Sequence, residues 1–145
     1  GEIFLRVNLL EKALVNLLQK HTTEQEKQSF EQQKDFLEAF EKGITLHFTV
    51  EEKALFPEMK RIGQIAESLV DELLSQHQSI MEKYKGLTQG AKSNEERRML
   101  LLSMVKELSA HTVKEERFVY PLVKQLNAEQ LEKVDQTASQ LGYQV

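Results

Sequence analysis

Cysteine is absent from the 145 residues of this chain. Its absence excludes disulfide bonds, thiolate-bound zinc and iron–sulfur clusters. Proline and glycine are scarce, with two and six residues, whereas Glu, Gln, Lys and Leu are frequent, which is typical of helical proteins. A chain of this length can bury a sizeable core without covalent cross-links. The composition therefore predicts an all-α fold that is held together by packing.

Long apolar runs and an excess of basic charge are absent as well. No run approaches the roughly 20 residues that a membrane span needs, and no signal-peptide pattern opens the chain. The net charge of -4 argues against nucleic-acid binding, which needs a basic stripe. No linker separates a second domain. We therefore expect one cytoplasmic domain, residues 1–145, that binds neither membrane nor nucleic acid.

One sequence pattern occurs twice and organises the chain. Residues 47–57 and 111–121 share, at matching positions, a His, a Glu-Glu pair, a basic residue, an aromatic residue and a proline. On an α-helix, residues i and i+4 lie on the same face, about 6 Å apart along the axis. Each copy therefore presents one imidazole and one carboxylate to the same point, as a chelating pair does. The pairs are His47 with Glu51 and His111 with Glu115.

Apolar residues at spacings of three and four predict four long helices and a short terminal one. Thr23 with Glu26 and Ser93 with Glu96 have the form of capping boxes. Short links between the helices favour an up-down-up-down four-helix bundle with a short C-terminal helix. The expected helices cover about 3–20, 30–57, 65–88, 93–121 and 127–142.

The expected bundle brings a third histidine to the level of the repeated motif. In antiparallel helices, residues equidistant from the connecting turn lie at the same height. His47 and His77 are centred on position 62, and His77 and His111 are centred on position 94. Both positions coincide with breaks between the predicted helices. Three helices thus bring a histidine to one level inside the bundle, and two of them add a glutamate.

A metal ion accounts for this arrangement better than a structural role does. A lone H-x-x-x-E pair is more often on the surface, and a lone His on an apolar stripe is more often a hydrogen-bonded core residue. Two buried carboxylates, however, need a compensating charge, because burying an unpaired anion is strongly unfavourable. Oxygen and imidazole ligands suit iron, manganese or zinc, and two carboxylates that can bridge favour a dinuclear centre. The predicted ligands are His47, Glu51, His77, His111 and Glu115.

The other polar and aromatic residues near the motif are expected to be structural. His21, at the end of the first helix, is expected at the surface. The second Glu of each pair projects about 100° away from the first, so it is expected to be solvated beside the next basic residue. The aromatic residue before each proline is expected in the core. These residues are Glu52 with Lys53, Glu116 with Arg117, Phe56 and Tyr120.

With these motifs the chain resembles the hemerythrin-like (HHE cation-binding) family over essentially its whole length. The specific likeness is H-x-x-x-E-E followed by aromatic-Pro on the second and fourth helices, with one His on the third. That family has a four-helix bundle around a non-haem di-iron site with two bridging carboxylates. Its members bind or sense O₂, handle nitric oxide, or help repair iron centres. The resemblance implies that His47, His77 and His111 are terminal ligands and that Glu51 and Glu115 are bridges.

Two departures from the family pattern affect the expected site. The family places a His on the first helix, at a level matching Val7 or Asn8, and this chain has none before His21. Dedicated O₂ carriers also have a His one turn before the third-helix ligand, where this chain has Leu73. The chain therefore differs from O₂ carriers, and one metal ion is expected to lack a ligand. Asn8 and Glu2 are the candidate oxygen donors.

The sequence thus predicts a non-haem iron protein, with two iron ions, that binds or senses O₂, NO or peroxide or handles iron. Zinc and manganese remain alternatives. The missing ligand predicts unequal occupancy, in which the position of His77 and His111 fills first and that of His47 stays partial. An enzyme would need a proton donor, for which Tyr84 is the candidate. A scaffold that has lost a ligand, or a protein with a single metal ion, is the other alternative.

Overall fold

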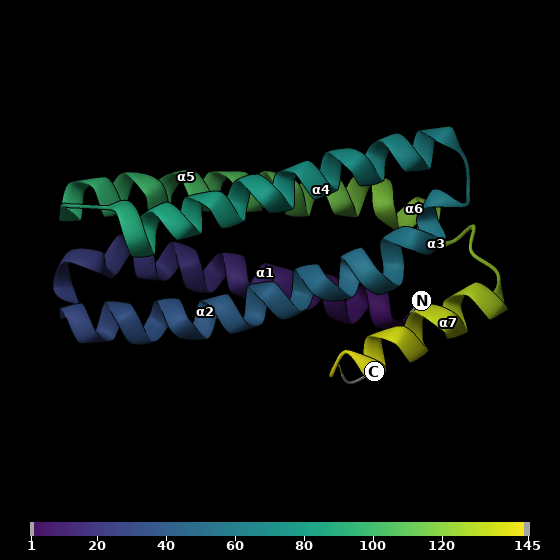
Figure 1. Cartoon of the computed structure of the whole chain (residues 1–145), viewed down its shortest axis with the longest axis horizontal. Helices are drawn as coiled ribbons and strands as arrows, with labels where there is room; N and C mark the ends of the chain where they lie inside the picture. Colours follow the sequence, from purple (N-terminus) through teal and green to yellow (C-terminus); the bar gives the residue numbers. More distant parts are fainter. Residues whose placement is uncertain (1, 144–145) are drawn as a thin grey trace.

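The computed structural model describes residues 2–143, and the side chains of residues 2–5 and 30 fall outside this description. The described chain contains no strand, and its helices form an up-down-up-down bundle (Figure 1), which confirms the predicted fold class. The long helices are α1 (Glu2–Glu24), α2 (Phe30–Val50), α4 (Gln64–Lys85) and α5 (Asn94–Lys114). The short elements are η1 (Gln25–Lys27), η2 (Glu51–Leu55), α3 (Phe56–Lys60), η3 (Gly86–Gly90), η4 (Glu115–Val119), α6 (Tyr120–Val123) and α7 (Ala128–Gln140).

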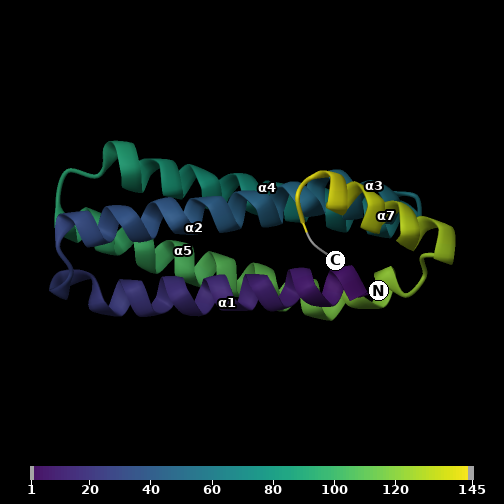
Figure 2. The same cartoon turned by 90° about the horizontal axis from the view of Figure 1, so that it is seen from below.

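The terminal helix α7 covers one end of the bundle, where the two termini of the described chain also lie (Figures 1 and 2). It packs against η2, the short element that follows α2. Asn127 caps its start by accepting a hydrogen bond from the Gln130 N–H, as its sequence predicts. Gly142, with φ of 93°, closes its end, because a glycine adopts the left-handed conformation at little cost.

Both copies of the sequence repeat pass through a π-helical turn. In η2 the Phe56 N–H donates to the Glu51 carbonyl, and in η4 the Tyr120 N–H donates to the Glu115 carbonyl. Proline cannot donate an N–H and crowds the carbonyl four residues earlier, so a wider turn just before it relieves the conflict. Helical backbone continues beyond each proline, in α3 and α6, and α3 ends at Lys60, just before Gly63. The expected end of the fourth helix at Pro121 is therefore wrong.

Two apolar clusters fill the interior, one on each side of a polar layer. One cluster lies towards α7 and includes Val7 and Leu73. The other lies towards η1 and η3 and includes Leu14 and Ile80. Glu11 and His77 stand between these positions along α1 and α4. The polar layer is therefore shielded by packed apolar side chains on both sides along the bundle axis.

The first connection is more helical and better packed than the sequence predicts. α1 continues to Glu24, and Thr22 and Gln25 are buried. His21 is also buried, not at the surface, and its ring stacks on Phe36 with centroids 4.0 Å apart. The segment that connects the first two helices is therefore only partly exposed: Thr22 and Gln25 are buried, whereas Thr23, Glu26, Lys27 and Ser29 are exposed.

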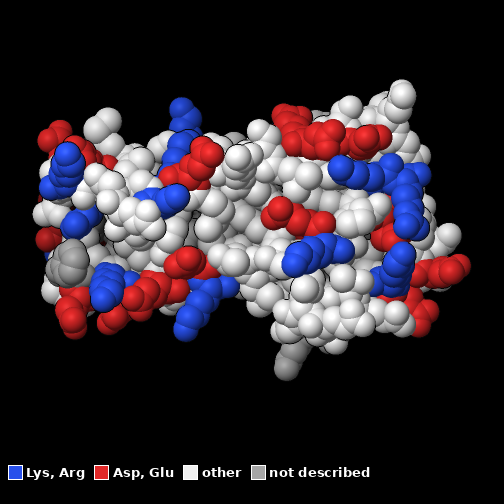
Figure 3. Space-filling model, in the orientation of Figure 1, with Lys and Arg blue, Asp and Glu red and all other residues white. Residues whose placement is uncertain are grey.

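The charged surface agrees with the expected absence of a nucleic-acid interface but does not test it. On the face seen in Figure 3, basic and acidic side chains are interspersed, without a continuous basic stripe. Within the described part of the chain, every helix is too short or too polar to span a lipid bilayer.

A pair of substitutions distinguishes the capping box in the structure from the one expected from the sequence. The Ser29 hydroxyl accepts from the Gln32 N–H, and the Gln32 side chain accepts from the Ser29 N–H. Thr23 instead donates to the Gln19 carbonyl within α1. We expect Ser29→Ala to lower the free energy of unfolding by about 1 kcal/mol, and Thr23→Ala to change it little. Urea unfolding of both variants measures this, and the reverse order would contradict the structure.

Candidate metal centre

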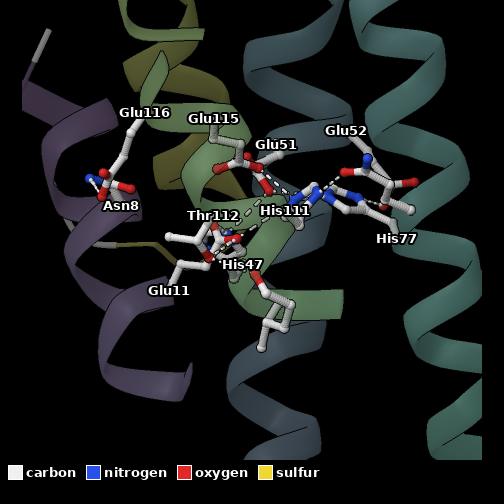
Figure 4. A network of polar contacts seen from close by, with 12 residues as sticks. Asn8, Glu11, His47, Glu51, Glu52, His77, His111, Thr112, Glu115 and Glu116 are labelled. Carbon is white, nitrogen blue, oxygen red and sulfur yellow. Dashed lines mark hydrogen bonds and ion pairs between the residues drawn. The ribbon is translucent and has the colours of Figure 1, made fainter. Parts of the chain in front are cut away.

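The five residues that the repeat and the third histidine predict lie together in the polar layer, with a sixth from α1 (Figure 4). Each long helix contributes, and the two glutamates of the repeat begin the π-helical turns. All six side chains are buried, with residue exposures between 0% and 3%. They are Glu11, His47, Glu51, His77, His111 and Glu115.

The six side chains form two overlapping groups of four possible ligands. One group contains His77 and His111, and the other contains Glu11 and His47. Both groups include Glu51 and Glu115, and within each group the four ligand atoms lie within 4.8 Å of one another. Two carboxylates shared between two sets of terminal ligands are the arrangement that a dinuclear centre requires.

Glu11, about one turn beyond Val7 and Asn8, is the residue of the first helix that lies in the cluster. Its Oε2 lies 2.8 Å from His47 Nε2, and its Oε1 accepts a 2.8 Å hydrogen bond from the Thr112 hydroxyl. A charged residue on the buried stripe of α1, between Val7 and Leu14, is the sequence signal that could have identified it. The first helix therefore supplies a carboxylate where the family pattern has an imidazole.

Asn8, one of the two oxygen donors expected from the first helix, is not brought into the cluster. The side-chain nitrogen of Asn8 lies 3.4 Å from Glu116 Oε1, so this side chain meets Glu116 and not the cluster (Figure 4). Val7 belongs to the apolar core. The side chain of Glu2, the other candidate donor, lies outside the described residues. Among the described residues of the first helix, the donor that the structure places in the cluster is Glu11.

The three imidazoles all direct Nε2 into the cluster. His77 Nε2 and His111 Nε2 lie 3.2 Å apart. Two nitrogens bound to one ion at about 2.1 Å and at right angles to each other are roughly 3 Å apart, so this spacing fits a shared metal ion. His111 Nε2 is 2.7 Å from Glu115 Oε1, and His47 Nε2 is 3.1 Å from Glu51 Oε1. Nitrogen and carboxylate lone pairs can thus converge on common points.

The shared carboxylates have no satisfactory partners of their own. Among the described residues, neither oxygen of Glu51 or of Glu115 takes part in a hydrogen bond of good geometry, although imidazole nitrogens are close. Leaving buried carboxylate oxygens without partners is costly. A metal ion between these oxygens and the imidazoles would satisfy both, so the residues present fit a bound cation.

Without a metal ion, protons must balance the charges of the cluster. Burial would raise the pKa of Glu51, but His47, followed by His77, holds it below its usual range. Burial, and then the charge of Glu51, raises the pKa of Glu115. Burial opposes protonation of His77, but Glu51 and Glu52 beside it raise its pKa to about 9. Protons and a metal ion therefore compete for the same side chains.

The outer nitrogens of the imidazoles have different partners. His111 Nδ1 lies 2.6 Å from the Gln76 side-chain oxygen, and His77 Nδ1 lies 3.3 Å from Glu52 Oε2. The expectation that Glu52 is merely solvated beside Lys53 is therefore wrong. Glu116, its equivalent in the second copy, is solvated, but its ion-pair partner is Lys12 of α1 and not Arg117.

Three other expectations can be compared with the structure. The Tyr84 hydroxyl donates to the Leu37 carbonyl and lies 3.2 Å from Glu41, so it does not face the metal ligands. Phe56 is buried, as expected. Tyr120 is 36% exposed, so its expected place in the core is wrong, and the Lys124 ammonium lies 4.8 Å from the centre of its ring.

The fold and the site together define a class, that of helical bundles with a buried histidine–carboxylate cluster built to hold cations. The family profile described as Hemerythrin HHE cation binding domain matches the chain twice, over residues 6–100 and 68–144. The chain belongs to this family. Each match includes one copy of the repeated motif. Comparisons with curated proteins and with solved structures give no match.

The metal-free protein should lose stability as the pH rises. His77 has a pKa of about 9 in the folded state, above its ordinary value of 6.5, so its stabilising effect is complete below pH 6.5 and is lost as the pH passes through 9. A shift of this size corresponds to at most about 3 kcal/mol. Urea unfolding in the presence of a chelator, between pH 6 and about 9, measures this loss.

The variant His77→Gln is the control for that experiment, because it removes the titrating imidazole and retains a polar side chain. Its free energy of unfolding should depend less on pH than that of the unmodified protein over the same range. Equal slopes for the two proteins would contradict the assignment of a raised pKa to His77.

Proposed function

We propose that this protein binds two iron ions in the polar layer and uses them to bind or sense a small ligand such as O₂, NO or peroxide. The observation that carries the proposal is the pair of overlapping four-residue groups that share Glu51 and Glu115. Membership of a cation-binding family supports the same reading. Mixed imidazole and carboxylate ligands suit iron, with manganese and zinc as alternatives.

Each residue of the layer then has a defined role. His77 and His111 would be the terminal ligands of one ion, and Glu11 and His47 those of the other. Glu51 and Glu115 would bridge the two ions. The bound iron would supply redox chemistry and open coordination positions for the small ligand.

The protein around the layer determines what reaches it. The apolar clusters on both sides keep bulk water out, so an uncharged small ligand is favoured over a hydrated one. Leu73, one turn before His77, is fully buried and offers no ligand atom, so an ion at His77 and His111 would have these two imidazoles as its terminal side-chain ligands. This leaves room for a small ligand at that ion.

The alternatives have less support. A scaffold that has lost a ligand was suggested by the missing first-helix histidine, and Glu11 removes that premise. An enzyme with Tyr84 as its proton donor is disfavoured because the Tyr84 hydroxyl is turned towards Glu41 and the Leu37 carbonyl. Binding or sensing of a small ligand therefore remains the function that the site supports best.

In place of the unequal occupancy expected from the sequence, we propose two positions with equal numbers of side-chain ligands, because Glu11 joins His47 in the second group. Anaerobic titration with Fe(II) should show close to two ions per chain. Glu11→Gln should weaken the Glu11/His47 position at least about 10-fold, because it removes a charged ligand. At micromolar iron, its stoichiometry should fall towards one ion per chain.

Asn8→Ala is the matched control for Glu11→Gln, because Asn8 lies one turn away on α1 but faces Glu116. It should keep the stoichiometry of the unmodified protein. For the same reason, Asn8→His should bring no gain in bound metal. A loss of metal in Asn8→Ala, or an unchanged stoichiometry in Glu11→Gln, would contradict the role assigned to Glu11.

Removal of the metal should lower the melting temperature, because a ligand that binds only the folded state stabilises it by mass action. With free metal at a thousand times its Kd, the effect is about 4 kcal/mol, or on the order of 10 °C for a chain of this size. Glu51→Ala should remove most of the difference between loaded and chelated protein in a thermal scan. If chelation removes the metal without a change in melting, a scaffold explains the protein better.

A further inference from the structure

The histidine ligands differ in what holds their outer nitrogens. His111 Nδ1 meets a neutral amide oxygen of Gln76, whereas His77 Nδ1 meets a carboxylate oxygen of Glu52. His47 Nδ1 is buried without a hydrogen-bond partner among the described residues. Of the three imidazoles, only His77 therefore has a charged partner on its outer side within the described structure.

The His77 ring is held from several directions. Glu51 Oε1 lies 3.2 Å from its Nε2, and Glu52 Oε2 lies 3.3 Å from its Nδ1. Phe48 stacks on its face with ring centroids 3.7 Å apart and planes 11° apart. Two consecutive glutamates of the repeat thus contact opposite nitrogens of one imidazole, as Figure 4 shows for the side of Glu52.

Glu52 also lies at the surface, in a groove of about 480 Å³ between α2 and α4. Its side chain is 42% exposed, and His77 and Phe48 belong to the lining of the groove. Solvent therefore screens the charge of Glu52 and reduces its electrostatic effect, although one of its oxygens contacts a buried imidazole. A change to this exposed residue is tolerated by the fold more readily than a change to a buried ligand.

The second copy of the repeat provides an internal comparison. Glu116 occupies the position in that copy that Glu52 occupies in the first. It forms an ion pair with Lys12, and the side-chain nitrogen of Asn8 is 3.4 Å from it. It therefore contacts neither His77 nor His111. The two glutamates share sequence context and exposure but differ in whether they contact a metal ligand.

We propose that Glu52 is a positioning residue for His77, which holds the ring with Nε2 directed at the metal and increases the donor strength of that imidazole through its negative charge. A carboxylate behind a metal-bound imidazole fixes the tautomer and raises the basicity of the ligand. The inference rests on the proposed function and deepens it. Compared with an amide at the same position, the Glu52 carboxylate would make an ion at His77 and His111 bind more tightly. It would also make the higher oxidation state of that ion more stable.

The test compares Glu52→Gln, which keeps an acceptor but removes the charge, with the control Glu116→Gln. Zinc titration against a competing chelator measures affinity without redox chemistry. In Glu52→Gln we expect one of the two binding steps to weaken about 10-fold and the midpoint potential of the iron-loaded protein to rise. In Glu116→Gln we expect neither change, because that residue contacts no ligand.

A second substitution, which places the negative charge beside His111 instead of His77, separates an electrostatic role of Glu52 from a merely structural one. Gln76 contacts His111 Nδ1, so Gln76→Glu places a carboxylate behind that imidazole instead. The double variant Glu52→Gln/Gln76→Glu should recover much of the affinity and lower the potential again. If Glu52 acts only through packing, the second substitution restores neither quantity.

A measurement on the metal-free protein keeps this inference separate from the proposed function. The Nδ1 proton of His77 should give a hydrogen-bonded NMR signal that is lost in Glu52→Ala and retained in Glu116→Gln. Absence of that signal from the unmodified protein overturns the positioning role whether or not metal binds. If the signal is present but no metal binds, the proposed function fails and the contact stands. Equal zinc affinities for Glu52→Gln and Glu116→Gln would also overturn the inference.

Discussion

Burial of three carboxylates and three imidazoles in one layer of the bundle is the constraint on which the rest of the structure depends. None of these side chains is more than 3% exposed, so water cannot balance their charges. The six side chains balance one another's charges only incompletely, because the oxygens of Glu51 and Glu115 lack good hydrogen-bond partners among the described residues. Such a layer persists only if protons or cations occupy it, and the choice between the two depends on pH and metal supply.

The bundle is adapted to this layer. Apolar clusters on both sides exclude water and lower the local dielectric constant, which strengthens every interaction inside it. The π-helical turns begin at the two bridging candidates, Glu51 and Glu115, and allow helical backbone to continue past each proline. The helix α7 packs against one of these turns and covers that end of the bundle. The same local sequence therefore presents a ligand and shapes the backbone behind it.

The two halves of the centre are related by the sequence repeat but are not equivalent. One group has two imidazoles as terminal ligands, and the other has an imidazole and the Glu11 carboxylate. Their surroundings differ too, since Glu52 reaches His77 whereas Glu116 turns to Lys12.

The sequence by itself determined the helical class, the order of the helices and the five candidate ligands of the repeat and third helix, because periodicity and i,i+4 spacing act within single helices and fix which face each residue occupies. Tertiary structure decided the sixth. Glu11 is an ordinary glutamate in the sequence, and only the packing of α1 against α2 and α5 places it beside His47 and Thr112. The burial of His21 and the different partners of Glu52 and Glu116 likewise depend on contacts between different helices, which local patterns do not encode.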